Sequence, residues 1–219
     1  MAEIKGAIFD LDGVIVNTVP LHFQAWKKMF EEYGHPFTMA DYLAKVDGRP
    51  RLEGAAAILG SLSPEEIRKA GEKKQSYYLG FLESEPIEIF QSTVKLIREM
   101  KARGMKLAAA SSSKNALRIL KKIDLYDIFD ANVSGGDFKK GKPNPEIFLT
   151  AASRLGLSPG QCVVFEDARS GVQAAMRGGF PCVGIDRHNH PGVLKGADRI
   201  VKDLAEIALA EVLNLKKGE

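Results

Sequence analysis

The chain has 219 residues, of which 45% are hydrophobic and 27% charged, values that are ordinary for a globular protein with one sizeable core or two small domains. Its net charge of +3 is small and no basic stripe is visible, so we expect no binding to nucleic acid. No apolar run approaches the roughly 20 residues that span a bilayer, and the first residues do not follow a secretory signal pattern, so we expect neither a membrane segment nor secretion.

The two cysteines, Cys162 and Cys182, both lie in apolar runs that are typical of buried strands. We interpret them as buried thiols in a reducing compartment, and a disulfide is the alternative that the sequence leaves open. Together with the lack of a long apolar run, this predicts a cytoplasmic protein.

Residues 7–14 are predicted to form a short apolar strand that leads into Asp10, Asp12 and a turn at Gly13. Because side chains alternate along a strand, the two carboxylates are expected to point to the same side. Two carboxylates held this close raise the pKa of at least one of them unless a cation lies between them. The pair therefore indicates a divalent metal site or a shared proton for acid/base work, and an exposed turn is the alternative.

The next segment, residues 18–88, is predicted to be a helical block without strands. The spacing of apolar residues predicts helices over 20–34, 39–46, 52–59 and 64–82. Ser63, Pro64 and Glu66 have the order of N-cap, first and third positions that is typical of a helix start. Trp26 is expected to be a core residue of this block.

From residue 93 the pattern changes to alternating helices and strands. Helices are predicted over 93–103, 115–123, 145–155, 170–177 and 204–213, and strands over 106–110, 131–134, 162–165, 182–185 and 199–201. This alternation predicts an α/β core with a mostly parallel sheet, made of residues 1–17 and 89–219, with residues 18–88 inserted as a helical domain. An insert that leaves after the first strand is expected to lie over the carboxyl ends of the strands as a lid, where open α/β sheets bind ligands.

Polar residues follow four of the predicted strands. They are Asp10 and Asp12 after the first, Ser111 to Asn115 after the second, Lys142 in the loop after the third, and Glu166 and Asp167 after the fourth. Hydroxyls and amides ahead of a helix favour anion binding, and Mg²⁺ is usually held by one or two carboxylates together with phosphate oxygens. The set therefore predicts a site for Mg²⁺ and a phosphate group.

Residues 136–142 match the first part of a nucleotide-binding P-loop. The next residue is Pro143, where that motif needs Ser or Thr for Mg²⁺, and proline also lacks an amide that would bind phosphate. We therefore reject an NTPase.

The order of these motifs resembles the haloacid dehalogenase (HAD) superfamily of aspartyl phosphotransferases over nearly the whole chain. The resemblance implies a Rossmann-like core with a helical cap, Asp10 as the nucleophile that becomes aspartyl-phosphate, and Asp12 as the general acid/base. It further implies the following ligands: for Mg²⁺, Asp10, the main-chain carbonyl of Asp12, Asp167 and, directly or through water, Glu166; for the phosphoryl oxygens, Ser111 and Lys142.

Within that superfamily the helical insert resembles that of the β-phosphoglucomutases. The resemblance implies that His22 lies at the cap hinge near the acid/base aspartate and that Lys74 contacts substrate. It also implies a phosphate and sugar loop at Gly48, Arg49 and Arg51, and a site for the phosphate remote from the metal at Ser113, Lys114 and Asn115. From the residues alone, the alternatives are a solvated loop for the arginines, a surface position for His22, and a solvated Lys74 whose register against Lys73 is open.

The resemblance implies a mutase that converts β-D-glucose 1-phosphate to glucose 6-phosphate through the 1,6-bisphosphate. We expect a monomer whose partner is a small sugar phosphate. A sugar-phosphate phosphatase on the same core is the alternative. A catalytically idle sugar-phosphate-binding module is disfavoured because each position with a chemical role is filled. Asp47 and Arg49 stand where the mutase loop carries a lysine and a small apolar residue, which leaves the sugar open.

Overall fold

The computed structural model describes residues 3–46, 49–187, 189 and 192–215. The chain divides into two compact units, one made of residues 1–17 and 88–219 and the other of residues 18–87. We call them the core unit and the helical unit. The sequence predicts boundaries after residues 17 and 88. The first coincides with the observed division after residue 17, and the second lies one residue beyond the observed division after residue 87.

The core unit is organised around a six-stranded sheet in the order β5-β4-β1-β6-β7-β8, and its neighbouring strands are parallel. The strands are β1 (Gly6–Phe9), β4 (Lys106–Ala110), β5 (Ala131–Val133), β6 (Cys162–Glu166), β7 (Cys182–Ile185) and β8 (Arg199–Val201). After β1, the chain adds β4 and β5 on one side of this strand and then β6, β7 and β8 on its other side. This change of direction beside β1 is a switch point, the place where open α/β sheets bind ligands. The predicted α/β fold with a mostly parallel sheet is confirmed.

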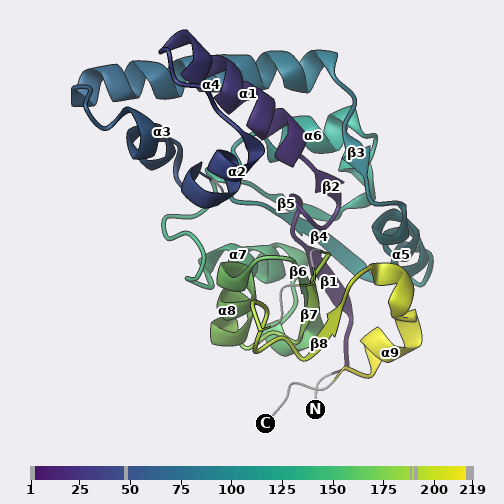
Figure 1. The fold of residues 1–219 in the computed structure, drawn as a ribbon. Helices are drawn as coiled ribbons and strands as arrows, with labels where there is room; N and C mark the ends of the chain where they lie inside the picture. Colours follow the sequence, from purple (N-terminus) through teal and green to yellow (C-terminus); the bar gives the residue numbers. More distant parts are fainter. Residues whose placement is uncertain (1–2, 47–48, 188, 190–191, 216–219) are drawn as a thin grey trace. The chain divides into compact units, whose positions relative to one another are not determined.

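Helices cover both faces of this sheet (Figure 1). On one face lie α7 (Glu146–Leu155) and α8 (Arg169–Gly178), and on the other lies α5 (Gln91–Ala102) with α9 (Leu209–Leu213) beside it. The remaining helical segments of the described core are α6 (Ala116–Lys122) and the 3₁₀ turns η2 (Tyr126–Ile128), η3 (Pro159–Gln161) and η4 (Leu204–Glu206). Gly156 and Gly179 end α7 and α8 in the left-handed conformation that glycine adopts without strain.

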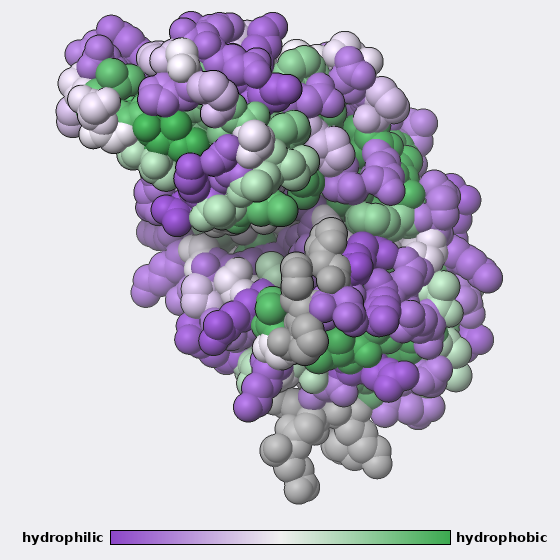
Figure 2. Space-filling view, viewed as in Figure 1, coloured by the Kyte–Doolittle hydropathy of each residue, from purple (hydrophilic) through white to green (hydrophobic). Residues whose placement is uncertain are grey.

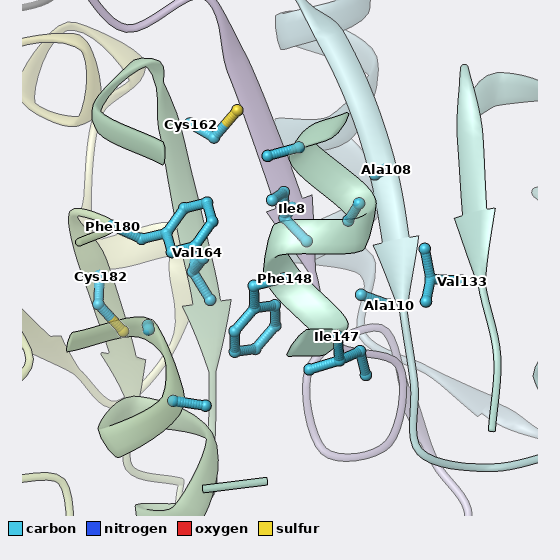
Figure 3. Packing of buried hydrophobic residues seen from close by; sticks show 14 of the residues in the cluster. Ile8, Ala108, Ala110, Val133, Ile147, Phe148, Cys162, Val164, Phe180 and Cys182 are labelled. Atoms are coloured by element: carbon cyan, nitrogen blue, oxygen red, sulfur yellow. The ribbon is translucent and has the colours of Figure 1, made fainter. Parts of the chain in front are cut away.

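One hydrophobic cluster of the core unit lies between the sheet and α7 (Figure 3). Ile8 of β1 and Val164 of β6 lie beside Phe148 of α7, and all three are fully buried. Burial of each such side chain contributes about 1.5–3 kcal/mol to folding. Cys162 and Cys182 belong to the same cluster as free, buried thiols, so the predicted burial of both residues is confirmed and the disulfide alternative is rejected.

The helical unit contains α1 (Val19–Glu32), α2 (Met39–Asp41), the π-helical segment η1 (Tyr42–Val46), α3 (Arg51–Leu59) and α4 (Pro64–Ser84). Ser63 caps α4, because its hydroxyl accepts from the Glu66 amide while the Glu66 carboxylate accepts from the Ser63 amide. This is the predicted helix start. The hydrophobic cluster of this unit is made by residues of α1, η1, α3 and α4, and Trp26 is buried in it, as predicted.

Two short strands link the units and were not predicted. β2 (Val16–Asn17) pairs antiparallel with β3 (Glu88–Ile89), so that the outgoing and returning segments lie side by side. Asn17 Nδ2 donates to Glu88 Oε2 at 2.7 Å. A strand of two residues has no measurable periodicity, so the pairing depends on a partner about 70 positions away that local sequence does not reveal.

The predicted continuous helix over 204–213 was wrong. η4 ends at Glu206, and Ile207 adopts an extended backbone (φ −125°, ψ 125°) before α9 begins. Ile207 is buried in this conformation. Tertiary packing of one apolar side chain therefore overrides a local pattern that favours helix.

Within the described ranges, none of the helices has the length and apolar character needed to cross a membrane. The face drawn in Figure 2 is largely hydrophilic, with apolar residues interspersed. Exposed large apolar side chains include Leu43 and Leu52 in the helical unit and Met176 and Ile200 in the core unit. Single exposed residues of this kind are normal on globular proteins.

Candidate active site

Three neighbouring strands bring polar residues together at one edge of the sheet in the core unit. Asp10 follows β1, Glu166 ends β6 and Ser111 follows β4. The Asp10 amide donates to the Phe165 carbonyl at 3.0 Å, which extends the β1–β6 pairing to the level of Glu166. The parallel register therefore positions the two carboxylates, and all three side chains are buried.

Lys142 connects two of these carboxylates. Its ammonium donates to Asp10 Oδ1 at 2.6 Å and also forms a short hydrogen bond with Glu166 Oε1. The lysine side chain is 10% exposed, and Glu166 is completely buried. Glu166 Oε2 accepts from the Ala168 amide at 2.8 Å. Both carboxylate oxygens of Glu166 thus accept a hydrogen bond, and Glu166 fixes the position of Lys142 against Asp10.

The electrostatics of the cluster follow from burial. Burial raises the pKa of Asp10 well above its ordinary value; Lys142 acts in the opposite direction, and Glu166, Asp167 and Asp12 add to the rise. Burial, together with the charge of Glu166, raises the pKa of Asp167 to about 7. For Lys142 burial favours the neutral amine, but Asp10 and Glu166 outweigh it and raise the pKa of the ammonium.

The site thus holds more carboxylates than ammonium groups, and this excess suits a cation. Within the described residues, no set of three or more His, Cys, Asp or Glu side chains is arranged to hold a metal alone. Mg²⁺ usually takes only one or two carboxylates and completes its shell with water, phosphate and carbonyl oxygens. The pair Asp10 and Asp167 fits that ligand set, because burial raises both pKa values and the neighbouring carboxylates add to the rise, so a bound cation would stabilise both groups in the charged form.

Gly13 makes room for Asp167. Its φ of +79° lies in the left-handed region, and a Cβ added there would lie 1.7 Å from Asp167 Oδ2. The glycine is therefore required twice, for its backbone conformation and for the space it leaves to the carboxylate.

The residues after β4 form a hydrogen-bonded turn ahead of α6. Ser111 Oγ donates to Asp12 Oδ2 at 3.4 Å and accepts from the Ser113 amide at 3.0 Å. Ser113 Oγ accepts from the Asn115 amide at 3.1 Å. Ser111 is buried beside the carboxylates, whereas Lys114 is exposed. The structure thus brings Ser111 together with Asp12, Asp10, Lys142, Glu166 and Asp167, and Ser113 and Asn115 continue the same turn.

Substituting Gly171 by Ala is expected to lower both the free energy of unfolding and turnover. Gly171 lies in the first turn of α8, and an added Cβ would lie 1.8 Å from Glu166 Oε1. The methyl group would displace the buried carboxylate that positions Lys142, at a cost of about 1–3 kcal/mol. Urea denaturation and hydrolysis of p-nitrophenyl phosphate measure the two effects.

Gly80→Ala is the matched control for this prediction. Gly80 lies inside α4, and an added Cβ would meet nothing within 4 Å. Alanine in a helix interior is favoured over glycine by about 1 kcal/mol, so this variant should be as stable as the wild type or more stable. Wild-type stability and activity in Gly171→Ala would contradict the importance of the Glu166 contact.

The helical unit contains a second group of predicted site residues. Lys74 Nζ lies 2.8 Å from His22 Nδ1, and it stands over the rings of Trp26 (5.1 Å) and Tyr78 (4.8 Å). The imidazole stacks on Tyr78, with ring centroids 4.2 Å apart. Lys74 is 4% exposed, whereas Lys73 is solvent-exposed and pairs with Glu32. The open register is thereby resolved, because it is Lys74 that points inward.

Both basic groups in this pair are shifted toward neutrality. Burial lowers the pKa of Lys74 to about 7, and the positive charge of Arg51 contributes to the shift. Burial, together with the charge of Lys74, lowers the pKa of His22 well below its usual value. The imidazole is therefore neutral at pH 7, and with Lys74 protonated Nδ1 accepts the hydrogen bond. A buried amine with a strongly shifted pKa is typical of functional sites.

Arg51 begins α3 and donates from Nη1 to Gln75 Oε1 at 2.9 Å. Both arginines of the predicted loop, Arg49 and Arg51, are exposed. Gly48 lies outside the described residues, as does Asp47. Gln75 was missed by the sequence reasoning. The signal that could have found it is its position next to Lys74 on the same helix.

Comparisons with known proteins agree on one family. A family model for haloacid dehalogenase-like hydrolases matches residues 4–179. The β-phosphoglucomutase of Bacillus subtilis (strain 168) is 34% identical over 213 residues, which cover 94% of this chain and 92% of the relative. The phosphorylated carbohydrates phosphatase of Thermotoga maritima is 36% identical over 184 residues, covering 81% and 82%. A crystal structure of β-phosphoglucomutase from Clostridium difficile superposes with a TM-score of 0.81 at 30% identity and covers 96% of both chains.

These relatives include both mutases and phosphatases, so the chain is an enzyme of either the phosphomutase or the phosphatase type. The polar residues at the strand ends of the core unit, which we call the strand-end cluster, agree with such chemistry. They combine the buried carboxylate of Asp10 with the ammonium of Lys142, which is fixed against it, and with the hydroxyl of Ser111. The protein belongs to the haloacid dehalogenase superfamily, in its β-phosphoglucomutase-like group.

Proposed function

We propose that the protein is a Mg²⁺-dependent β-phosphoglucomutase that converts β-D-glucose 1-phosphate into glucose 6-phosphate through a phosphoryl group carried on Asp10. The observation that carries the phosphotransferase part is the buried Lys142, which holds one oxygen of Asp10 while Glu166 holds the lysine. A carboxylate fixed in this way at the end of β1 is suited to act as a nucleophile.

The proposed reaction has two halves. In the first, a carboxylate oxygen of Asp10 attacks phosphorus, the bond from phosphorus to the sugar oxygen breaks, and Asp12 gives its proton to that oxygen. In the second, a sugar hydroxyl attacks the aspartyl-phosphate, Asp12 takes the hydroxyl proton, and Asp10 leaves as a carboxylate. Ser111 and Lys142 stabilise the phosphoryl oxygens as negative charge develops. Bound Mg²⁺, held by Asp10, the Asp12 carbonyl and Asp167, would supply further charge neutralisation.

The helical unit supports transfer to a sugar rather than to water. A bisphosphate intermediate needs an anion site in addition to the reacting centre, and Arg51 lies close enough to Lys74 for its charge to contribute, after burial, to the lowered pKa of that lysine. A phosphate dianion bound between them would relieve this repulsion, and the planar guanidinium of Arg51 matches phosphate oxygens. His22 holds Lys74 in position without adding charge, because its imidazole is neutral.

Hydrolysis of a sugar phosphate is the second candidate function. It is favoured by the 36% identity to a phosphatase that acts on phosphorylated carbohydrates. Incubation with Mg²⁺, β-glucose 1-phosphate and a trace of the 1,6-bisphosphate, with both glucose 6-phosphate and free phosphate measured, separates the two. We expect glucose 6-phosphate to dominate. Mainly free phosphate would replace the mutase by the phosphatase, and no turnover of any sugar phosphate would refute both.

Arg51→Ala is expected to lower kcat/KM for β-glucose 1-phosphate by roughly 10–100-fold, since a hydrogen bond to a charged group contributes about 1.5–3 kcal/mol. Hydrolysis of p-nitrophenyl phosphate, which has no second phosphate or sugar to bind, should change by less than about 3-fold. Arg118→Ala in the core unit, an arginine of α6 outside the proposed sites, is the control. Equal losses on both substrates in Arg51→Ala would argue against a second phosphate site.

Lys74→Met is expected to stabilise the protein near neutral pH while impairing sugar-phosphate turnover. The pKa of Lys74 is lowered to about 7 in the folded state and is 10.5 when unfolded, so between these values the unfolded chain binds the extra proton. Stability of the wild type therefore rises with pH across this window, and the methionine variant lacks the rise. We expect a gain of about 1–3 kcal/mol at pH 7 that shrinks toward pH 10.

Urea denaturation of wild type and Lys74→Met at several pH values measures this difference. Lys73→Met is the matched control, because Lys73 is exposed and its pair with Glu32 lies at the surface. Its stability should stay within about 1 kcal/mol of the wild type at every pH. A Lys74→Met variant whose difference from wild type is independent of pH would show that Lys74 does not titrate in this window.

A further inference from the structure

Arg187 makes three contacts in the core unit although no motif points to it. It follows β7, and its side chain is largely buried, with 16% exposed. Nε donates to the Gly13 carbonyl at 3.2 Å, and Nη1 is paired with Asp203 Oδ2. The guanidinium carbon lies 3.6 Å from the centre of the Phe90 ring. The side chain is thus held on three sides.

Stability alone does not explain this placement. The Nη2 atom of Arg187 is buried and has no hydrogen-bond partner in the described part of the chain. A buried donor without a partner costs about 1–3 kcal/mol, and this cost opposes the gain from the other contacts. The buried position of Arg187 is therefore better explained by the group to which this side chain donates.

That group is the turn that carries Asp12. The Gly13 amide donates to the Val16 carbonyl at 2.8 Å, and the Gly13 carbonyl accepts from Arg187, so both peptide groups of the glycine are fixed. Asp12 precedes this glycine directly. Asp167 packs against it, because a Cβ at Gly13 would lie 1.7 Å from the Asp167 carboxylate. A displacement of Gly13 would therefore shift the adjoining residue Asp12 and crowd Asp167.

The next two carbonyls of the turn are fixed by the start of α5. Thr93 Oγ1 donates to the Val14 carbonyl at 2.7 Å, and the Phe90 amide donates to the Ile15 carbonyl at 3.0 Å. Phe90 is also the ring on which the Arg187 guanidinium stacks. Three successive carbonyls of the turn, from Gly13 to Ile15, thus accept from groups outside it. The bond from Arg187 is the one nearest to Asp12.

We propose that Arg187 is a positioning residue for phosphoryl transfer: by holding the Gly13 carbonyl it fixes the Asp12 carboxyl where it protonates the leaving oxygen. This rests on the proposed function, in which Asp12 is the general acid. Arg187 itself touches neither substrate nor reacting atoms. Placing a catalytic group with a small error costs up to about 100-fold in rate, and residues behind catalytic groups typically contribute 10–100-fold.

The consequence is a dependence on the leaving group. A phenolate with a nitro substituent leaves with little help from an acid, whereas unsubstituted phenolate needs the proton more. A misplaced Asp12 should therefore slow phenyl phosphate much more than p-nitrophenyl phosphate. A variant that merely destabilises the fold would slow both to the same degree.

Arg187→Met tests this, because methionine keeps the apolar stem over Phe90 and removes every donor. In Mg²⁺ we expect kcat/KM to fall roughly 10–100-fold for phenyl phosphate and less than about 5-fold for p-nitrophenyl phosphate. Arg187→Lys is the second variant in case the first does not fold. Its single ammonium replaces the two separate nitrogens that contact Gly13 and Asp203, so it should show the same selective loss to a smaller extent.

Arg154→Met is the matched control. Arg154 also donates to a main-chain carbonyl, that of Asn132, at 2.5 Å and pairs with a carboxylate, Asp137, but it lies beside β5 away from the strand-end cluster. It should lose stability without selectivity between the two substrates. Equal losses on both substrates in the Arg187 variants, or the same selectivity in Arg154→Met, would overturn the proposal.

Asp12→Asn separates a failure of this proposal from a failure of the proposed function. If Asp12 is the acid, this variant must show the strongest selective loss on phenyl phosphate. If Asp12→Asn slows phenyl phosphate more than p-nitrophenyl phosphate and the Arg187 variants do not, the role of Arg187 is overturned and the acid role of Asp12 stands. An Asp12→Asn variant that slows both substrates equally overturns the acid role itself.

Discussion

Asp10→Asn is expected to abolish turnover of every phosphate ester, with kcat lowered by about 10⁴-fold or more, as when other enzymes lose their nucleophile. The amide is nearly isosteric with the carboxylate but is a poor nucleophile and cannot form the acyl phosphate. Folding should be retained, because the wild-type carboxylate is buried with a raised pKa and its loss removes repulsion from Glu166 and Asp167. Turnover assays test the loss of activity, and thermal unfolding tests the retained fold. The mass of the protein after incubation with acetyl phosphate tests whether an acyl phosphate forms.

Asp12→Asn is the matched control, since it makes the same chemical change two residues away. It leaves the nucleophile intact and should still take up one phosphoryl group from acetyl phosphate, whose leaving group needs little acid assistance. Asp10→Asn should take up none. A phosphorylated Asp10→Asn protein, or one that keeps its activity, would place the nucleophile elsewhere in the chain.

Much of the core unit could be predicted because its signals are local. β4, β7 and β8 have the predicted bounds, since short apolar runs flanked by polar and glycine residues determine them. The polar residues that end the strands then converge because parallel strands share a carboxyl edge. This argument alone predicts that Asp10, Ser111 and Glu166 lie together.

The missed features depend on contacts between distant parts of the chain. Glu166 was expected near the metal, and the structure adds that it binds Lys142 and packs against Gly171. Arg187 was not selected, because an arginine after a strand is usually a solvated surface residue and its partner Gly13 lies 174 positions earlier. In the helical unit the inward direction of Lys74 depends on the exact phase of α4, because an error of one residue turns a side chain by about 100° around the helix.

Lys142→Met is expected to be strongly destabilising as well as inactivating. The ammonium is 10% exposed and pairs with Asp10 and Glu166, so its removal leaves two buried carboxylates without a counter-charge. Breaking a buried pair from one side costs about 3–5 kcal/mol. Lys101→Met removes an ammonium that is 38% exposed and paired with Asp130, and it should cost less than about 1 kcal/mol. Urea denaturation at pH 7 measures both.

The pH dependence of Lys142→Met gives the sharper test. Lys142 now lowers the pKa of Asp10 against the effect of burial, so without the lysine that pKa rises further above its unfolded value. The folded variant then binds more protons than the unfolded chain from about pH 4 upward, and its stability falls as pH rises. The deficit relative to wild type should thus be smallest near pH 4 and largest near neutrality. Adding Glu166→Gln, which removes one of the two repelling carboxylates, should recover part of it at pH 7. A deficit that is constant with pH, or unchanged by the second substitution, would mean that lost packing rather than uncompensated charge destabilises the variant.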